Sequence, residues 1–163
     1  MRDMQAAEIP ITTNSEYISA LDTLCTLAQK NLYVFERDFV SIGFNSNNRY
    51  EILKRFLLAS PHNKLQFIAH NTRPIFPNCP QLVQLSRQFS HNFQIFQTPR
   101  HLQHLSEAFA IADELHCIRR FHMDATRGIF TQNVSTAAIP LRSRFDELLQ
   151  ASKPSANTGT FTL

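Results

Sequence analysis

Basic side chains recur just after the short apolar runs of this sequence. Each follows a predicted strand, and the set is Arg37, Arg73 and Arg100, with His101 beside the last. Ligands of open α/β sheets bind beyond the carboxyl ends of the parallel strands, and guanidinium groups bind phosphate or carboxylate oxygens through paired hydrogen bonds. The pattern therefore predicts an anion-binding site. The alternative left open is that these are ordinary loop arginines, some of them paired with Glu36 or Asp38.

The other side chains that could bind a metal or act as nucleophiles do not form a recognisable metal-binding or catalytic motif. His122-x-Asp124 places two potential ligands on one face of an extended segment, but no third ligand lies nearby, so a polar strand end is favoured over a metal site. Cysteines are few and widely spaced, without a Cys-x-x-Cys pair, at Cys25, Cys79 and Cys117. This spacing argues against a zinc or redox motif and fits a reducing compartment. No metal and no cofactor is expected.

Composition limits the class of protein. A chain of 163 residues with 43% hydrophobic residues and 14 Phe is long enough to bury the core of one domain. Only 3 Gly disfavours glycine-rich phosphate loops, and a net charge of +3 from scattered basic residues is a weak indication of nucleic acid, whose binding surfaces are clustered. The N-terminal residues lack the apolar core of a signal peptide, and no run is long enough to span a membrane. A cytoplasmic protein without membrane association is expected.

Periodicity predicts the elements that position these residues. Helical spacing of apolar residues predicts four helices, at Ser15–Lys30, Asn48–Leu58, Pro80–Phe89 and Pro140–Leu149. Short apolar runs predict strands at 32–35, 65–69 and 93–96, and a later hairpin region adds strands at 108–113, 116–121 and 128–131. Because helix-length segments separate the first three strands, parallel pairing is expected there, with antiparallel pairing in the hairpin.

These elements predict one domain. We expect residues 1–12 to form a flexible arm, residues 13–152 a single α/β domain, and residues 153–163 a disordered tail of small polar residues. The expected architecture is a mixed, mostly parallel sheet flanked by helices on both faces.

The order of the elements over about residues 15–152 supports a more specific comparison. Its main segments are Leu32-Tyr-Val-Phe-Glu-Arg-Asp-Phe, Leu65-Gln-Phe-Ile-Ala, Phe93-Gln-Ile-Phe, Ala108-Phe-Ala-Ile-Ala-Asp113 and Arg144-Phe-Asp-Glu-Leu-Leu. In this order they resemble one half of a phospholipase D-like protein, and more closely a degenerate bacterial branch of uncharacterised domains. The resemblance implies a phospholipase D-like half domain, an α/β sandwich with a mixed sheet.

In active members of that superfamily two halves meet and each supplies a His-x-Lys-x-x-x-x-Asp motif. One His forms a covalent phospho-intermediate and the other acts as general acid. His62-x-Lys64 matches the first part, but position 69 is Ala and His62 precedes its strand. His104 lies nearer the expected place, but position 106 is Ser. Asp113 is either a remnant of the motif's acid or simply a turn residue. The resemblance therefore implies a degenerate site.

The sequence thus predicts a non-catalytic phospholipase D-like domain that binds a protein partner or a phosphate-bearing ligand, nucleic acid included. Two alternatives stay open. One is a divergent homodimeric phosphodiesterase or nuclease that uses His101, His104 or His122. The other is an accessory domain of an acetyltransferase, which only the domain neighbours of the resembled family imply.

Overall fold

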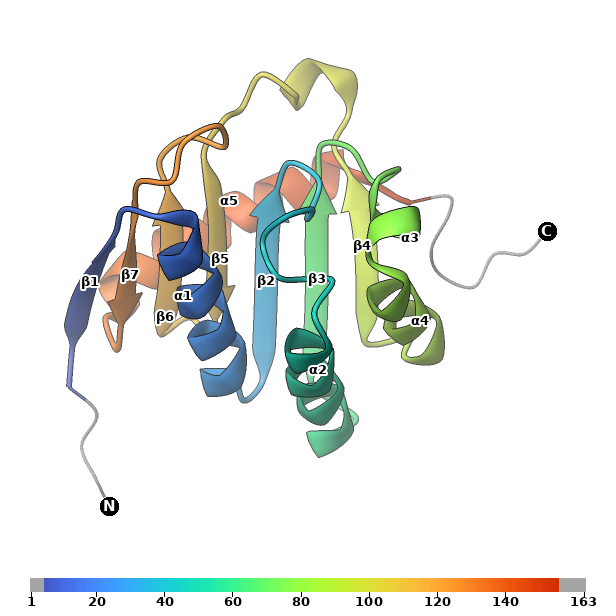
Figure 1. Ribbon diagram of the computed structural model, residues 1–163, viewed down its shortest axis with the longest axis horizontal. Helices are drawn as coiled ribbons and strands as arrows, with labels where there is room; N and C mark the ends of the chain where they lie inside the picture. Colours follow the sequence, from blue (N-terminus) through green and yellow to red (C-terminus); the bar gives the residue numbers. More distant parts are fainter. Residues whose placement is uncertain (1–4, 156–163) are drawn as a thin grey trace.

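A computed structural model describes residues 5–155, which form one eight-stranded sheet with helices on both faces (Figure 1). The strands are β1 (Ala7–Ile11), β2 (Asn31–Glu36), β3 (Lys64–Ala69), β4 (Phe93–Gln97), β5 (Ala108–Ala112), β6 (His116–Arg120), β7 (Gly128–Gln132) and β8 (Lys153–Pro154). The helices are α1 (Asn14–Leu27), α2 (Asn47–Ala59), α3 (Ile75–Asn78), α4 (Pro80–Gln88), the 3-10 helix η1 (Arg100–Leu102) and α5 (Ser135–Ala151). The predicted α/β sandwich is confirmed.

The strand order across the sheet is β1-β7-β6-β5-β2-β3-β4-β8. Parallel pairing joins β2 to β3 and β3 to β4, where a helix separates consecutive strands. The remaining pairs are antiparallel, including the contact between β2 and β5. The mixed sheet was predicted, but parallel pairing is confined to three neighbouring strands, β2, β3 and β4, which lie towards one side of the sheet. Antiparallel pairs outnumber parallel ones because the hairpin region and both terminal segments extend the sheet.

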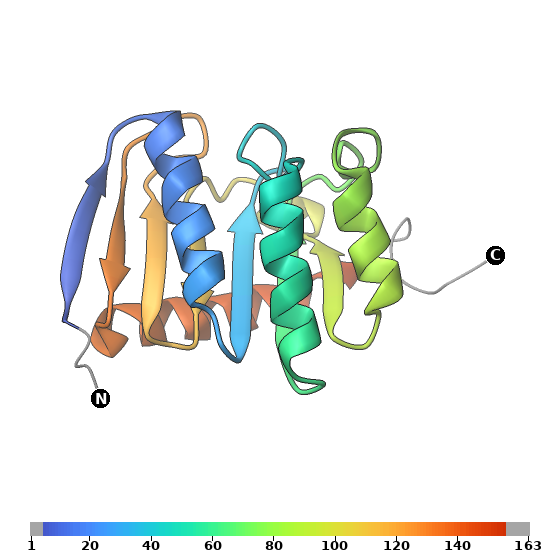
Figure 2. The ribbon, with the colours of Figure 1, turned by 60° about the horizontal axis from the view of Figure 1, so that its bottom comes forward.

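Two layers of helices cover the sheet (Figure 2). Helices α1, α2 and α4 lie over one face, and α5 runs across the other. Strand β2 is apolar without interruption because it packs on both sides. Leu32 and Val34 belong to the core beneath α1 and α2, whereas Tyr33 and Phe35 belong to the core beneath α5, which includes Phe145.

The helix ends show which local signals were informative. A capping box begins α1, since Thr13 Oγ1 accepts from the amide of Glu16 and the Glu16 carboxylate accepts from the amide of Thr13. Helix α2 is capped by Ser46 and so begins one residue ahead of its predicted start at Asn48. Helix α5 begins at Ser135, ahead of the predicted start at Pro140, which lies exposed inside the helix.

Both ends of the described chain are more ordered than predicted. Ala7–Ile11 was expected within a flexible arm but pairs with β7 as an edge strand. Lys153–Pro154 was expected in a disordered tail but pairs with the edge of β4, and the amide of Ser155 donates to Ile95 O at 2.8 Å. Both segments contain a proline, which an edge strand tolerates because one side of its backbone is unpaired. Residues 1–4 of the expected arm and 156–163 of the expected tail lie outside the described residues.

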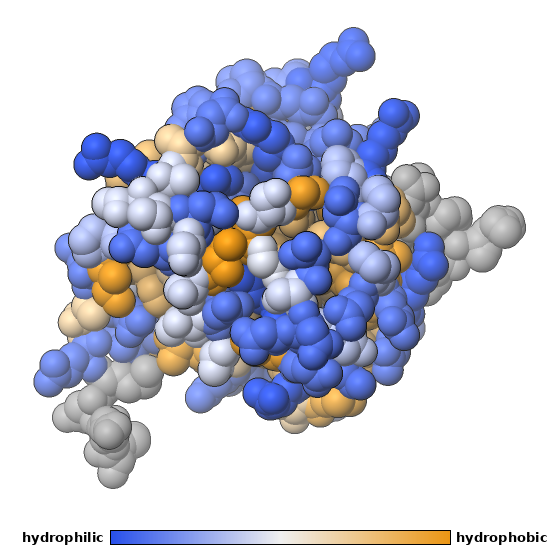
Figure 3. All heavy atoms as spheres, in the orientation of Figure 1, coloured by the Kyte–Doolittle hydropathy of each residue, from blue (hydrophilic) through white to orange (hydrophobic). Residues whose placement is uncertain are grey.

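The face of the molecule drawn in Figure 3 is mainly polar. Figure 3 shows a face on which hydrophobic side chains form small, separate patches. Large apolar side chains exposed in residues 5–155 belong to different parts of the chain, at Ile9, Leu58, Phe121 and Ile139. None of the helices described is both long and apolar enough to cross a membrane.

Candidate anion-binding site

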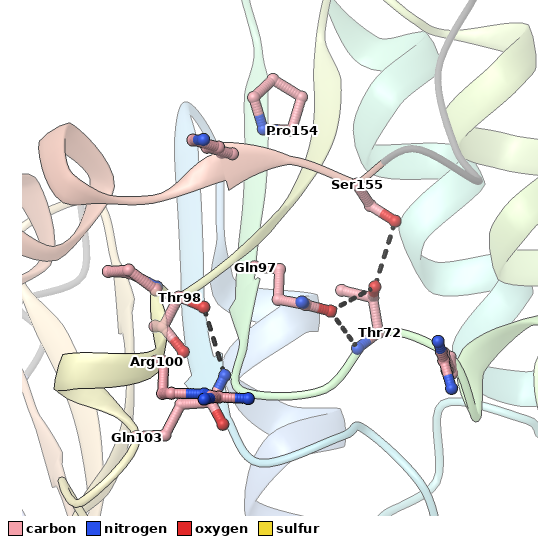
Figure 4. Close-up of a pocket in the computed structure, with 10 residues that line it drawn as sticks. Thr72, Gln97, Thr98, Arg100, Gln103, Pro154 and Ser155 are labelled. Carbon is pink, nitrogen blue, oxygen red and sulfur yellow. Dashed lines mark hydrogen bonds between the residues drawn. The ribbon is translucent and has the colours of Figure 1, made fainter.

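A cavity of about 660 Å³ lies beyond the carboxyl ends of β3 and β4 (Figure 4). Its walls come from Thr72 and Arg73 after β3, from the segment 97–103 at the end of β4, and from the segment 153–155 that includes β8. Small-molecule sites in proteins commonly measure about 300–1,000 Å³. The cavity therefore has the size of a ligand site and lies where ligands of open α/β sheets bind.

The cavity is positively charged. Three of its lining residues are Arg73, Arg100 and Lys153, and no Asp or Glu of the described chain lines it. None of these three cations pairs with a carboxylate within residues 5–155, whereas most other arginines there do. Cations without a neutralising partner create a positive potential that attracts anions. Arginine in addition supplies paired donors that match phosphate geometry.

Neutral polar groups complete the wall, and their orientations follow from their hydrogen bonds. Gln97 Oε1 accepts from the amide of Thr72 at 3.0 Å and from its hydroxyl at 2.8 Å. The hydroxyl of Ser155 donates to Thr72 Oγ1 at 3.1 Å, which links β8 to this pair (Figure 4). Because Oε1 must be the acceptor, the amide nitrogen of Gln97 is the other end of the group, and it has no partner among residues 5–155. The amide nitrogen of Gln97 is therefore a hydrogen-bond donor that is available to a ligand in the cavity.

His70 lies behind the cavity wall. Its Nε2 is 2.7 Å from Leu105 O and its Nδ1 is 2.7 Å from Thr98 Oγ1. A carbonyl only accepts, so Nε2 carries the proton in the neutral ring, and the Thr98 hydroxyl donates to Nδ1. Burial lowers the pKa of His70, with smaller effects in the same direction from Arg37 and His104, while the bond to Leu105 O opposes the shift.

The four residues predicted to bind an anion do not all converge. Arg73 and Arg100 line the cavity. Arg37 instead pairs with Asp124 across 2.5 Å, and this contact lowers the pKa of the Asp124 carboxyl. His101 is exposed on η1 and is not among the residues that line the cavity. Arginine pairing with a nearby acid was left open from the sequence, although with Glu36 or Asp38 as partner.

Sequence reasoning missed Lys153 and the two glutamines of the wall, Gln97 and Gln103. Lys153 was placed in a disordered tail because a two-residue strand has no periodicity to detect. Gln97 offered one usable signal, since it directly follows the strand predicted at 93–96. Gln103 belongs to an irregular segment, where its Nε2 donates to the carbonyls of His70 at 3.0 Å and Thr98 at 3.3 Å.

A second cluster of charged groups is buried under the end of β2. The carboxylate of Glu36 accepts from the Tyr17 hydroxyl, from the amide of Arg37 and from Arg120 Nη2. Burial raises the pKa of Glu36 and raises that of Tyr17 well above its usual value. A small cavity of about 250 Å³ adjoins Glu36 and Arg120. Because each oxygen of Glu36 already has a donor, this cluster is an internal ion pair.

The described residues contain no cluster of three or more metal-binding side chains. His122 and Asp124 are 3.8 Å apart, but the carboxylate is held by Arg37. The cysteines are buried and free. Asp113 is a turn residue with a φ of 59°, and its carboxylate accepts from the backbone amides of residues 29, 30 and 31. These hydrogen bonds therefore stabilise the loop between α1 and β2.

Comparison with solved structures identifies the fold. TrmBL2, an archaeal chromatin protein described as showing a novel mode of DNA binding, aligns with a TM-score of 0.67 at 8% identity, over 91% of this chain and 54% of that one. Nuc from Salmonella typhimurium, a phospholipase D family member, aligns with a TM-score of 0.62 at 7% identity, over 93% and 99% of the two chains. This chain thus spans about half of TrmBL2 and nearly all of Nuc.

NucT from Helicobacter pylori aligns with a TM-score of 0.56 at 12% identity, over 93% of this chain and all of the other, 100%. These likenesses confirm the phospholipase D-like fold expected from the sequence. A search of curated proteins gave no match. The family described as Domain of unknown function (DUF7931) matches residues 13–161, and the chain belongs to that family.

Proposed function

We propose that this chain is a non-catalytic phospholipase D-like domain that binds a phosphate-bearing ligand in the cavity at the ends of β3 and β4. The observation that carries the proposal is the presence of Arg73, Arg100 and Lys153 around one cavity without a carboxylate partner in the described chain. Such cations bind phosphate through charge-assisted hydrogen bonds. A protein partner remains the alternative occupant of the surface, but the large apolar side chains exposed within residues 5–155 are few and come from different parts of the chain.

The motif positions support the non-catalytic part of the proposal. Counting back from Asp113 by the spacing of the superfamily motif reaches Ser106 for the His and Ala108 for the Lys. Neither residue supplies the imidazole or the ammonium group that phosphodiester cleavage requires in that superfamily. The acid of the motif is present, but it holds backbone amides.

Calorimetric titration with inorganic phosphate and pyrophosphate at low salt tests the proposal. We expect the purified protein to bind pyrophosphate, and the double variant Arg73→Ala/Arg100→Ala to lose about a hundredfold in affinity, since each charged hydrogen bond contributes about 1.5–3 kcal/mol. Arg55→Ala/Lys64→Ala is the matched control, because both residues are exposed and lie away from the cavity. Equal affinity of the wild-type protein and the first double variant would refute the site.

A second candidate is a divergent phosphodiesterase or nuclease formed by two copies of the chain. The likeness to Nuc over almost its whole length favours it, and DNA binding by TrmBL2 makes nucleic acid a reasonable substrate class. His101, His104 and His122 are exposed and would be the catalytic candidates. Hydrolysis of bis(p-nitrophenyl) phosphate that disappears in single His→Ala variants would establish this activity and displace the non-catalytic proposal.

A further inference from the structure

We propose that the ligand of the Arg73–Arg100–Lys153 cavity is a compact, hydroxylated phosphate ester, such as a sugar phosphate, and not a nucleic-acid strand. The proposal rests on the anion site described above and names the chemistry of its ligand. Three features of the cavity support it: the neutral polar groups of its wall, the lack of aromatic side chains, and the position of the other free cations.

The wall offers both a donor and an acceptor beside its cations. Gln97 Nε2 is a donor without a partner in the described chain, because Gln97 Oε1 is held by Thr72. Gln103 is fixed in the opposite sense: its Nε2 donates to two backbone carbonyls, which leaves Oε1 as an acceptor without a partner within residues 5–155. A fully ionised phosphate has no proton to give to such an acceptor. A hydroxyl group both gives and receives, so a hydroxylated ester matches the two amides.

The described lining residues include no Phe, Tyr or His. Proteins that bind single-stranded nucleic acid combine a positive groove with aromatic side chains on which the bases stack, each worth about 1–3 kcal/mol. The only rings among the described lining residues are the saturated rings of Pro99 and Pro154, which offer no π-face to a base. A base would therefore gain little in this cavity, whereas a phosphate and a short polyol would use the groups that are present.

Several unpaired cations of the described residues lie far from the cavity. Lys30 and Lys64 lie at the amino ends of β2 and β3, and Arg55 lies on α2. These cations are at the opposite end of the parallel strands from Arg73 and Arg100, so one polymer backbone in the cavity does not reach them. Nucleic-acid binding surfaces are clustered patches or stripes that engage several phosphates at once. An isolated pocket of about 660 Å³ fits one small anion.

A set of matched ligands tests the inference on the full chain by calorimetry. The affinity for inorganic phosphate measures binding at the anion site alone. In n-butyl phosphate the phosphate carries a carbon chain without hydroxyl groups. Glycerol 3-phosphate, ribose 5-phosphate and glucose 6-phosphate add hydroxyls. We expect at least one of these three esters to bind about tenfold more tightly than butyl phosphate, the effect of one or two additional hydrogen bonds. If all three bind no better than butyl phosphate, the inference is wrong while the anion site stands.

Two further outcomes separate the possibilities. A 5′-phosphorylated oligothymidine is expected to bind no more tightly than the best ester and to show a shallow salt dependence, because few phosphates are engaged. Tighter binding with a steep salt dependence would overturn the inference in favour of nucleic acid. Failure of inorganic phosphate and of every ester to bind would instead refute the underlying anion site, together with this inference.

Discussion

Arg120 Nη2 donates to both carboxylate oxygens of Glu36, at 2.7 and 2.9 Å, and joins the end of β6 to the end of β2 across the intervening strand β5. Within the sheet Arg120 lies opposite Ala108, the residue that occupies the motif position of the superfamily's lysine. The cation next to that position is thus a buried arginine whose charge Glu36 already neutralises. The side chain beside that position is therefore part of an internal ion pair.

This pair leads to a prediction about stability. Arg120→Met is expected to lower the free energy of unfolding by about 3–5 kcal/mol, because Glu36 would keep a buried charge without its cation. Adding Glu36→Gln should restore more than half of the loss, since the amide has no charge and its oxygen still accepts from the Tyr17 hydroxyl. Urea unfolding of the two single variants and the double variant measures the coupling. Equal losses in Arg120→Met and in the double variant would contradict the ion-pair account.

The placement of Arg73 and Arg100 was predictable because it depends on a short-range rule. A strand followed by a helix and another strand pairs in parallel, and the residues after the two strands meet at one edge. The pairing of Arg37 was not predictable in the same way. Its partner Asp124 belongs to the loop after β6, and no local pattern reports which two loops come together.

The ends of the chain show a second limit of sequence reasoning. Strands β1 and β8 are stabilised by pairing with β7 and β4, and neither has the alternation of buried and exposed residues that identifies a strand from its sequence. Their polar or proline-containing composition instead suggests a loop. Lys153 was missed for this reason, although it supplies one of the three cations of the cavity.

Gln97→Glu is expected to weaken anion binding strongly without disturbing the fold. The carboxylate keeps an oxygen for the amide and hydroxyl of Thr72, but it replaces the Nε2 donor with a negative charge. Repulsion of a phosphate should weaken binding by more than tenfold, as measured by calorimetry with pyrophosphate. The melting temperature serves as the check on folding. Gln94→Glu, on the same strand but outside the cavity lining, is the matched control and should bind as the wild type does.

His70 gives the protein a predicted pH dependence. Burial lowers its pKa below the ordinary histidine value of about 6.5, so the unfolded chain binds a proton at a higher pH than the folded chain does. Stability is therefore expected to be complete above about pH 6.5 and to fall as the pH decreases towards the folded-state pKa, with no further loss from this residue below it. Urea unfolding at pH 7.5 and 5.5 measures the change.

The variant His70→Gln should reduce this pH dependence, because the glutamine amide can still donate to Leu105 O but does not titrate. His116, whose pKa is also lowered by burial, contributes in the same direction in both proteins. His62→Gln, at an exposed site, controls for the loss of a histidine as such. If His70→Gln and His62→Gln show the same pH dependence of stability, burial of His70 does not cause the pH dependence of the wild-type protein.

Asp113 allows a test of whether its carboxylate has a structural role. Its Oδ1 accepts from the amides of Lys30 and Asn31 at 2.8 and 3.0 Å, and its Oδ2 accepts from Gln29 at 2.9 Å. Asp113→Ala would remove all three acceptors and is expected to cost about 2–4 kcal/mol of unfolding free energy, since hydrogen bonds to charged groups contribute about 1.5–3 kcal/mol each when buried and less when exposed.

Asp113→Asn keeps one acceptor oxygen for Lys30 and Asn31 and should lose less than Asp113→Ala. Both variants are expected to bind pyrophosphate with unchanged affinity while they remain folded, because Asp113 follows β5 at the amino-end side of β2, away from the cavity. Chemical unfolding and calorimetry on the same samples separate the two properties. A loss of binding in a fully folded Asp113→Asn protein would show that the acid of the motif still serves a ligand, and the structural role argued for it would be wrong.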